Sequence, residues 1–563
     1  MKPILCIAVK FLCQIIKRQK YIFFDELFAV NVNCVLSLHI LSNAILTYFM
    51  LVRIHTAALQ GIEALPVSIE IHVSRGIRFS IVGLPDNAVR ESHERIASAL
   101  QINGMNIPRK QVIVNLSPAN IRKEGTSYDL PLAVGLMLAG DHFPKEAVEN
   151  SLFIGELSLD GSLQAVNGVL PVAVLCKELG LHKLYAPFQN AREASAIEGL
   201  EVFAVHHLKE LKAHLGGEKP MAAFCDEGPA ASAAGHPCPE DLSLVKGQAS
   251  VKRAVEIACC GGHNLIMIGP PGAGKSMIAK CIPGILPPMS REEAIETTKI
   301  HSVAGKTVEN GQILSHRPFR SPHHSISAVA MIGGGNHPQP GEISLAHNGV
   351  LYLDELPEFP RSVLEVLRQP LEDRSVHISR SRYSVDFPAD FMLIASMNPC
   401  PCGYYNHPTK PCVCSPGQVR KYLNRISGPL LDRFDLQIEI APLSYDDMSS
   451  RQKEESSESV RQRVVRARAL QQERFADTPG VYCNAQMDAS LLQAHATIDS
   501  QGQALLRNAM EKLNLSARAY SRILKVARSI ADLEGSAQIA PQHLAEAISY
   551  RQLDREDWAE RRL

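Results

Sequence analysis

The chain has 563 residues, several times the usual domain size of about 100–200 residues, so two to four domains are expected. Hydrophobic residues make up 45% and charged residues 21%, and the 36 glycines and 35 prolines follow no period. This composition indicates a globular protein and excludes a collagen-like fibre or a wholly disordered chain. The 58 basic and 58 acidic side chains cancel, which excludes a globally basic nucleic-acid coat but allows a local basic groove.

The N-terminal segment 27–52 contains no Asp, Glu, Lys or Arg and is long enough to cross a bilayer of about 30 Å. Polar residues interrupt this segment, no second one follows, and a new alternating pattern begins at Met50. We therefore expect the folded protein to start at Met50, and residues 1–49 to be a start-site artefact or a disordered extension. No stable membrane association is expected.

Three folded blocks are expected after the extension. Residues 50–217 alternate β-like runs with helical stretches and predict one α/β domain. Residues 218–240 are rich in Ala, Pro and Gly and predict a linker. Residues 241–443 predict a second α/β domain, and residues 444–555 a helical domain. The elements expected in the first block are strands at Val67–Val73, Arg78–Leu84 and Gln111–Leu116 and helices at Asn87–Asn103 and Leu130–Ala139.

A glycine-rich loop follows the apolar strand expected at 264–268 and opens a helix. Its residues are Gly269, Pro270, Pro271, Gly272, Ala273, Gly274, Lys275 and Ser276. In this context the backbone N–H groups and the helix N-terminus bind the α- and β-phosphates of a nucleotide. We expect Lys275 to reach the β- and γ-phosphates and the Ser276 hydroxyl to ligate Mg²⁺. These features predict a Mg²⁺-dependent ATPase.

Two further strands are expected to complete the nucleotide site. The apolar strand at 350–353 ends in Asp354, which would hold the metal through water, and Glu355, which would orient or deprotonate the attacking water. The strand at 391–395 leads to Asn398, placed to sense the γ-phosphate. Arg433 and Arg518 are candidates for neutralising the transferring phosphoryl group, Arg433 from a neighbouring subunit.

The order of these motifs is similar to that in AAA+ ATPases. Residues 318–324, 340–347 and 353–359 resemble the magnesium-chelatase-like branch, and residues 50–553 resemble the ComM (YifB-type) competence family. The resemblance implies an α/β protein with a Lon-protease-like (ribosomal S5 domain 2-like) N-terminal domain, a central AAA+ P-loop domain and a C-terminal helical lid. It also implies a cytoplasmic, hexameric ATPase that uses ATP and Mg²⁺, acts on single-stranded or branched DNA in recombination, and has recombination proteins as partners.

Two other functions are alternatives. A magnesium-chelatase subunit, which inserts Mg²⁺ into a tetrapyrrole, should need a partner with an adhesion-type metal domain and should lack the Lon-like domain. An ATP-dependent peptidase would use Ser127, which stands at the nucleophile position of Lon. However, Leu170 stands where the Lon pattern has the lysine base, so we expect a scaffold without proteolytic activity.

Four of the 14 cysteines lie within fifteen positions, at Cys400, Cys402, Cys412 and Cys414. Four thiolates are the ligand number of tetrahedral Zn²⁺, with His407 as a substitute ligand. Free thiols or a redox pair are the alternatives. One local cluster in a long chain is typical of a reduced cytosolic protein.

A hairpin with a basic tip is expected around residues 376–383. Related ring motors point such a hairpin into the central pore. There Arg380 and Arg382 would grip phosphates and Tyr383 would stack on a base. The alternative is an ordinary hairpin with solvated arginines.

Overall fold

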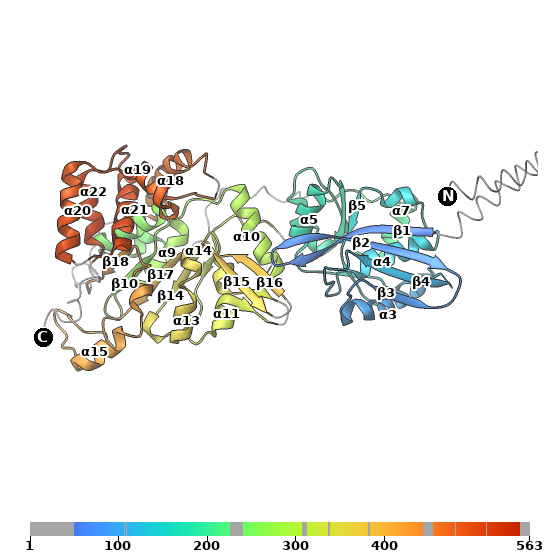
Figure 1. Ribbon diagram of the computed structural model, residues 1–563, viewed down its shortest axis with the longest axis horizontal. Helices are drawn as coiled ribbons and strands as arrows, with labels where there is room; N and C mark the ends of the chain where they lie inside the picture. The colour runs from blue at the N-terminus through green and yellow to red at the C-terminus, as the bar shows by residue number, and fades with distance from the viewer. Residues whose placement is uncertain are drawn as a thin grey trace, which may run out of the picture.

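The computed structural model describes residues 50–551 except positions 106, 109, 226–239, 307–311, 336–337, 381–382, 443–453, 479 and 514. The expected extension at 1–49 and most of the expected linker lie outside these residues. Figure 1 shows two lobes, one built on a seven-stranded sheet and the other on a five-stranded sheet with the C-terminal helices. Across the described part of the chain, no helix combines the length and apolar character needed to cross a bilayer.

The N-terminal lobe is built around a long antiparallel hairpin, β1 (Met50–Gln60) and β2 (Glu63–Ser74). Alternate residues of β2 are buried, as expected for a sheet with one face on the core. The strand order is β3-β4-β2-β1-β5-β8-β9. The other strands are β3 (Phe79–Val82), β4 (Gln111–Ser117), β5 (Ser151–Phe153), β8 (Lys183–Pro187) and β9 (Glu201–Val205). The helices are α3 (Asn87–Ile102), α4 (Asp129–Ala139), α5 (Val169–Glu178), α6 (Phe188–Ser195) and α7 (Leu208–Leu215).

The strands and helices expected in this lobe are confirmed, with shifted ends. The strand expected from Val67 begins at Glu63 instead, because Gly61 adopts a φ of 64° and lets the chain turn back at once onto β1. The helix α3 begins after Asp86, whose side chain accepts a hydrogen bond from the Val89 N–H.

The second lobe contains a parallel sheet in the order β11-β14-β17-β10-β18. The strands are β10 (Leu265–Ile268), β11 (Phe319–Arg320), β14 (Val350–Leu353), β17 (Met392–Met397) and β18 (Leu436–Glu439). The continuous apolar runs of β10 and β14 are typical of a parallel sheet covered by helices on both faces. Because β17 lies between β10 and β14, the residues that follow these three strands meet at one edge of the sheet.

Helices and one hairpin surround this sheet. The hairpin comprises β15 (Ser375–Arg380) and β16 (Tyr383–Pro388), which confirms the expected element. The main helices are α8 (Ala249–Gly261), α9 (Lys275–Ile285), α10 (Arg291–Val303), α11 (Ala328–Ile332), α12 (Glu342–Leu345), α13 (Arg361–Val366), α14 (Pro370–Asp373), α15 (Pro416–Leu423) and α16 (Gly428–Leu431).

The C-terminal helices share a core with the parallel sheet. Val464 and Ala527 belong to the same buried apolar cluster as Val255 of α8 and Ile282 of α9. The helices are α18 (Ser457–Arg474), α19 (Ala489–His495), α20 (Ser500–Leu513), α21 (Ala517–Leu533) and α22 (Pro541–Ser549).

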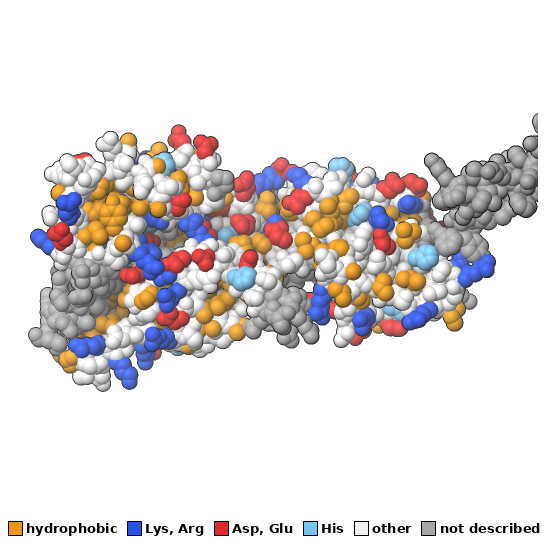
Figure 2. Space-filling model, in the orientation of Figure 1, with side chains coloured by type: hydrophobic (Ala, Val, Ile, Leu, Met, Phe, Trp, Pro, Cys, Tyr) orange, Lys and Arg blue, Asp and Glu red, His pale blue; other side chains and the backbone are white. Residues whose placement is uncertain are grey.

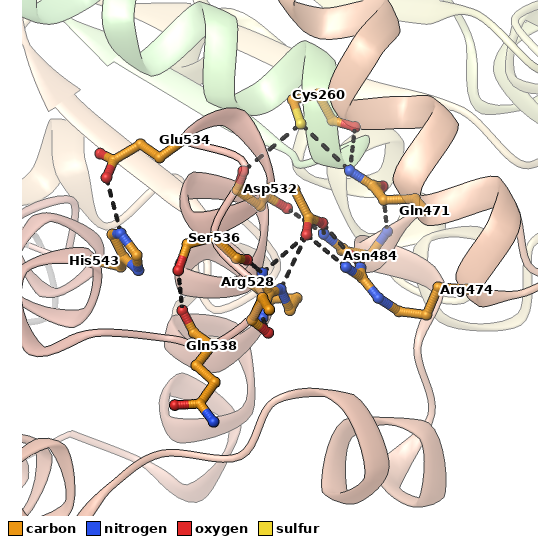
Figure 3. A network of polar contacts seen from close by, with 12 residues as sticks. Cys260, Gln471, Arg474, Asn484, Arg528, Asp532, Glu534, Ser536, Gln538 and His543 are labelled. Atoms are coloured by element: carbon orange, nitrogen blue, oxygen red, sulfur yellow. Dashed lines mark hydrogen bonds and ion pairs between the residues drawn. The ribbon is translucent and has the colours of Figure 1, made fainter.

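A buried polar network also holds these helices together (Figure 3). The Asp532 carboxylate accepts hydrogen bonds from Arg474, Asn484 and Arg528. Gln471 Nε2 donates to the Cys260 carbonyl oxygen at 3.2 Å, which connects the network to α8. The charged groups of the network are thus paired, as buried charges must be.

The two lobes touch where the β1–β2 turn meets the β15–β16 hairpin (Figure 1). Ile62 of the turn is buried in one cluster with Val385 and Phe387 of the hairpin. A Cβ on Gly61 would lie 2.6 Å from Val385 Cγ1, so the turn packs closely on β16. Elsewhere in the interface, the Gly168 N–H donates to the Ser302 carbonyl oxygen at 3.2 Å.

Candidate nucleotide-binding site

The glycine-rich loop connects β10 to α9, as the sequence predicts. Gly272 and Gly274 have φ values of 81° and 85°, conformations that favour glycine, and Gly274 caps the N-terminus of α9. Lys275 Nζ donates to the carbonyl oxygens of Gly269 and Pro270 at 2.7 and 2.9 Å and to Asn398 Oδ1 at 3.1 Å. The lysine from β10–α9 and the asparagine after β17 therefore meet, as the strand order requires.

Ser276 and Asp354 form the second half of the site. Ser276 Oγ donates to Asp354 Oδ2 at 2.8 Å, so a hydroxyl and a carboxylate lie side by side. Oxygen ligands of this kind suit Mg²⁺. Burial alone raises the pKa of Asp354, but hydrogen bonds from Ser396 and Ser276 outweigh it and keep the pKa below its usual value. The carboxylate is thus ionised at neutral pH.

The sequence did not reveal the role of Ser396 in this site. Its hydroxyl donates to Asp354 Oδ1 and accepts a hydrogen bond from the Tyr352 hydroxyl at 3.1 Å. Ser396 is fully buried within β17. A polar residue in a buried strand is the signal that could have drawn attention to it.

Glu355 is exposed and sits in the left-handed region with a φ of 53°. Its Oε2 atom lies 3.8 Å from Nδ1 of His324, a residue from the loop after β11 that the sequence did not assign to the site. Burial lowers the pKa of Lys275, and the charges of Asp354 and Glu355 offset part of that effect. The site thus combines one cation, two carboxylates and a polar amide at the ends of three adjacent strands.

Arg433 and Arg518 lie away from these residues. Arg433 follows α16 and its carbonyl oxygen accepts a hydrogen bond from the side chain of Asn264, immediately before β10. The phosphate loop follows the opposite end of β10. Since the strand has four residues at about 3.3 Å each, the two ends of β10 are roughly 13 Å apart. Both guanidinium groups approach Glu372 Oε1, Arg433 at 2.5 Å and Arg518 at 3.7 Å. The structure therefore brings the two arginines together, but not onto Lys275 of the same chain.

The two arginines differ in exposure. The Arg433 side chain is 5% exposed and its Nε donates to the Arg368 carbonyl oxygen at 3.0 Å. The Arg518 side chain is 58% exposed and lines a cavity of 460 Å³ between the sheet and the C-terminal helices. Arg518 is thus largely open to solvent, whereas Arg433 is enclosed and hydrogen-bonded.

Asp435 anchors the C-terminal helices to the sheet, a role the sequence did not predict. Its carboxylate accepts hydrogen bonds from the Asn264 N–H at 3.0 Å and from Arg522 of α21 at 2.5 Å. Burial raises the pKa of Asp435, but Arg522 and His263 outweigh burial and hold the pKa well below its usual value. The ionised form is therefore the one that the fold stabilises.

Asp435→Asn is expected to destabilise the second lobe by about 3 kcal/mol, because it leaves Arg522 without its charged partner. The measurement is the midpoint of urea unfolding at pH 7. Because the folded-state pKa is depressed, this stabilisation is present above the unfolded-state pKa of about 3.9 and is lost as the pH falls below it. The difference between the two proteins should accordingly shrink in acid. Asp432→Asn is the matched control, and equal midpoints for Asp435→Asn and the wild type at pH 7 would contradict the anchor.

The expected hairpin is present, with Arg380 paired to Tyr383 in the backbone register at its end, while Arg382 lies outside the described residues. The inward face of the hairpin, including Val376 and Val385, is buried, and the side chains of His377 and Asp386 on the other face are exposed. On the face shown in Figure 2, Lys and Arg side chains are interspersed with Asp and Glu. DNA binding by Arg380, Arg382 and Tyr383 stays a prediction.

The four clustered cysteines converge on one point. Their Sγ atoms all lie within 4.8 Å of one another, and the pairs 400–402, 400–412 and 402–412 are 3.3, 3.7 and 3.5 Å apart. Tetrahedral zinc with Zn–S bonds of about 2.3 Å places its sulfur ligands about 3.8 Å apart. His407 is not part of the cluster, and its Nδ1 accepts hydrogen bonds from the N–H groups of Thr409 and Lys410.

Comparison with known proteins identifies the family. Residues 241–448 match the family described as magnesium chelatase, subunit ChlI, residues 69–190 match subunit ChlI of Mg-chelatase, and residues 454–551 match the subunit ChlI C-terminal family.

YifB of Salmonella typhimurium is 44% identical over 512 residues, which cover 89% of this chain and 97% of that protein. The competence protein ComM of Haemophilus influenzae is 42% identical over 506 residues, with the same two coverages of 89% and 97%. The 38 kDa magnesium-chelatase subunit of Rhodobacter capsulatus is 24% identical over 229 residues, 37% of this chain and 58% of that protein. The chain is more than 40% identical to YifB and ComM, and the matched region covers nearly the whole length of both proteins. It therefore belongs to the YifB/ComM family, whose core is an AAA+ ATPase of the magnesium-chelatase type.

Proposed function

We propose that the protein is an ATP-driven ring motor, a homohexamer that migrates branched DNA junctions in homologous recombination, as in natural transformation. The observation that carries this proposal is the position of Arg433 and Arg518, which share Glu372 far from Lys275 of their own chain. A neighbouring subunit would bring such arginines to the nucleotide. The relative from Haemophilus influenzae is a competence protein by name, which supports DNA as the substrate.

The nucleotide site supports ATP hydrolysis in the following way. Lys275, which donates to carbonyl oxygens of the loop, would bind the β- and γ-phosphates, and Ser276 and Asp354 would hold Mg²⁺. The metal would neutralise charge on the phosphate oxygens. Glu355 orients the attacking water and accepts its proton, and Asn398, already bonded to Lys275, contacts the γ-phosphate.

The remaining parts fit a cytoplasmic motor. The C-terminal helices act as the lid that carries Arg518, and the N-terminal lobe is a Lon-like domain without a peptidase site. Leu170, which stands at the position of the Lon lysine base, has an apolar side chain that is fully buried in an apolar cluster and cannot act as a base. Four of the 14 cysteines lie in one local cluster of a long chain, which fits a reducing compartment.

Zinc is the second metal of this proposal. Cys400, Cys402, Cys412 and Cys414 supply four soft ligands at spacings close to those of a tetrahedral site. The Tyr405 N–H donates to Cys400 Sγ at 3.3 Å, an interaction that stabilises a thiolate.

A chelatase subunit is the second candidate function, favoured by the matches to the ChlI families. Against it, the Rhodobacter subunit covers 37% of this chain, whereas the YifB and ComM relatives cover 89%. We therefore rank the DNA motor first.

The test is ATP turnover by the purified chain without DNA, with single-stranded DNA and with a four-way junction. We expect DNA to stimulate turnover and the junction to be unwound or moved in an ATP-dependent manner. Lys275→Ala is the control, since it should show no turnover with any DNA. If no DNA changes turnover, the motor proposal is wrong, and stimulation by a porphyrin with a partner protein would favour the chelatase.

A further inference from the structure

The cysteine cluster lies directly beside the nucleotide site. Cys400 follows Asn398 by two positions, and the loop that carries the four cysteines connects β17 to α15. Within this loop Gly403 has a φ of 82°, and a Cβ placed on it would lie 2.6 Å from Pro271 Cδ. The cysteine loop therefore rests on the tip of the phosphate loop without room for a side chain.

The segment after the cysteines folds back onto Asn398, the residue at which the cysteine loop begins. The helix α15 begins at a capping box formed by Ser415 and Gln418. Tyr422, near the end of α15, is buried, and its hydroxyl lies close enough to the Asn398 backbone to be influenced by it, although burial dominates and raises the pKa of Tyr422. Just beyond the helix, Arg425 donates to Glu358 Oε2 at 2.9 Å, in the turn after Asp354 and Glu355. Residues 398–425 thus contact all three parts of the site.

Burial alone does not hold the cysteine loop in this shape. Of the fourteen residues between Cys400 and Ser415, seven are exposed, including Val413 at 83%, and one, Gly403, is buried. A segment with so few buried side chains needs another source of stability, and four thiolates at metal-binding distances provide one.

We propose that zinc bound by the four thiolates is a structural cross-link that presses Gly403 against Pro271 and so sets the shape of the phosphate loop. This inference rests on the zinc assignment made under the proposed function. Gly403 is a positioning residue, because it would influence ATP binding only through its contact with Pro271 of the phosphate loop. Loss of the metal should therefore weaken ATP binding first, and turnover at saturating ATP much less.

The experiment begins with metal analysis and ATP binding of the full-length protein without DNA. We expect one zinc per chain in the wild type and in Gly403→Ala, and none in Cys412→Ser. Gly403→Ala must displace Pro271 by about 1 Å, and a displacement of that size weakens function by up to about 10²-fold. ATP binding should therefore weaken in both variants. Gly417→Ala is the matched control, since a Cβ there meets nothing within 4 Å.

A second substitution tests whether the contact itself is responsible. Pro271→Ala removes the Cδ and Cγ atoms that a Gly403 side chain would strike. Adding it to Gly403→Ala should recover part of the ATP affinity, so the two effects should not add. Strictly additive losses would overturn the contact as the cause.

The outcomes distinguish the zinc site itself from its link to the phosphate loop. A wild-type protein that contains no zinc, or that carries a disulfide among these cysteines, overturns the metal site and the cross-link with it. One zinc per chain together with unchanged ATP binding in Gly403→Ala overturns only the link to the phosphate loop. Because DNA is not present in these measurements, neither outcome depends on the motor proposal.

Discussion

Arg433→Ala is expected to bind ATP with nearly wild-type affinity and to hydrolyse it about 10³–10⁵ times more slowly. The reason is that its guanidinium would stabilise the phosphoryl group bound by a neighbouring subunit, while its own phosphate loop is at the far end of β10. The measurement is steady-state turnover beside a nucleotide-binding assay. Mixing Arg433→Ala with Lys275→Ala should restore some activity, since some interfaces then pair an intact loop with an intact arginine.

Two controls separate this effect from damage to the fold. The Arg433 side chain is buried and donates to the Arg368 carbonyl oxygen, so the unfolding midpoint of the variant must be compared with that of the wild type. Arg461→Ala removes an arginine of α18 that pairs with Glu458, and should leave turnover unchanged. Normal hydrolysis by Arg433→Ala would exclude the arginine from the neighbouring site.

Glu355→Gln is expected to retain ATP and to lose a factor of about 10²–10⁴ in hydrolysis, the usual contribution of a positioned base. The amide keeps the size of the side chain but cannot accept the proton of the attacking water. Metal binding should persist, because Asp354 and not Glu355 contacts Ser276. Single-turnover hydrolysis measured alongside ATP retention distinguishes the two steps.

Glu365→Gln is the matched control for this experiment. Glu365 is a carboxylate of α13 that pairs with Arg368 at 2.7 Å, away from the phosphate loop. Its replacement should not change hydrolysis. If Glu355→Gln hydrolyses ATP at the wild-type rate, the assignment of the water-orienting carboxylate is wrong.

The nucleotide site was predictable because its parts are local signals. A glycine-rich loop between a strand and a helix commonly binds phosphate groups. The polar residues Asp354 and Asn398 follow directly on the apolar strands that end at Leu353 and Met397. Since parallel strands point their carboxyl ends to the same edge, Asp354 and Asn398 were expected near Lys275. The contacts of Lys275 and Ser276 agree with that expectation.

Long-range pairs were not predictable from one sequence. Asp435 and Arg522 are separated by 87 positions, and only packing of α21 against the sheet brings them together. Likewise, periodicity places Gly403 in a loop but does not show that Pro271 lies against it. The burial of Arg433 follows from the position of α14 and Glu372, which no local pattern encodes.

The contact between the β1–β2 turn and the β15–β16 hairpin bears on how the N-terminal lobe should be studied. A truncated chain that begins near Asp241 would uncover the side of Val385 that Gly61 and Ile62 now cover. Loss of activity after such a deletion would then combine the missing lobe with a newly exposed apolar surface, which promotes aggregation. Substituting Gly61, where an added methyl group meets Val385, disturbs the contact while the lobe stays in place.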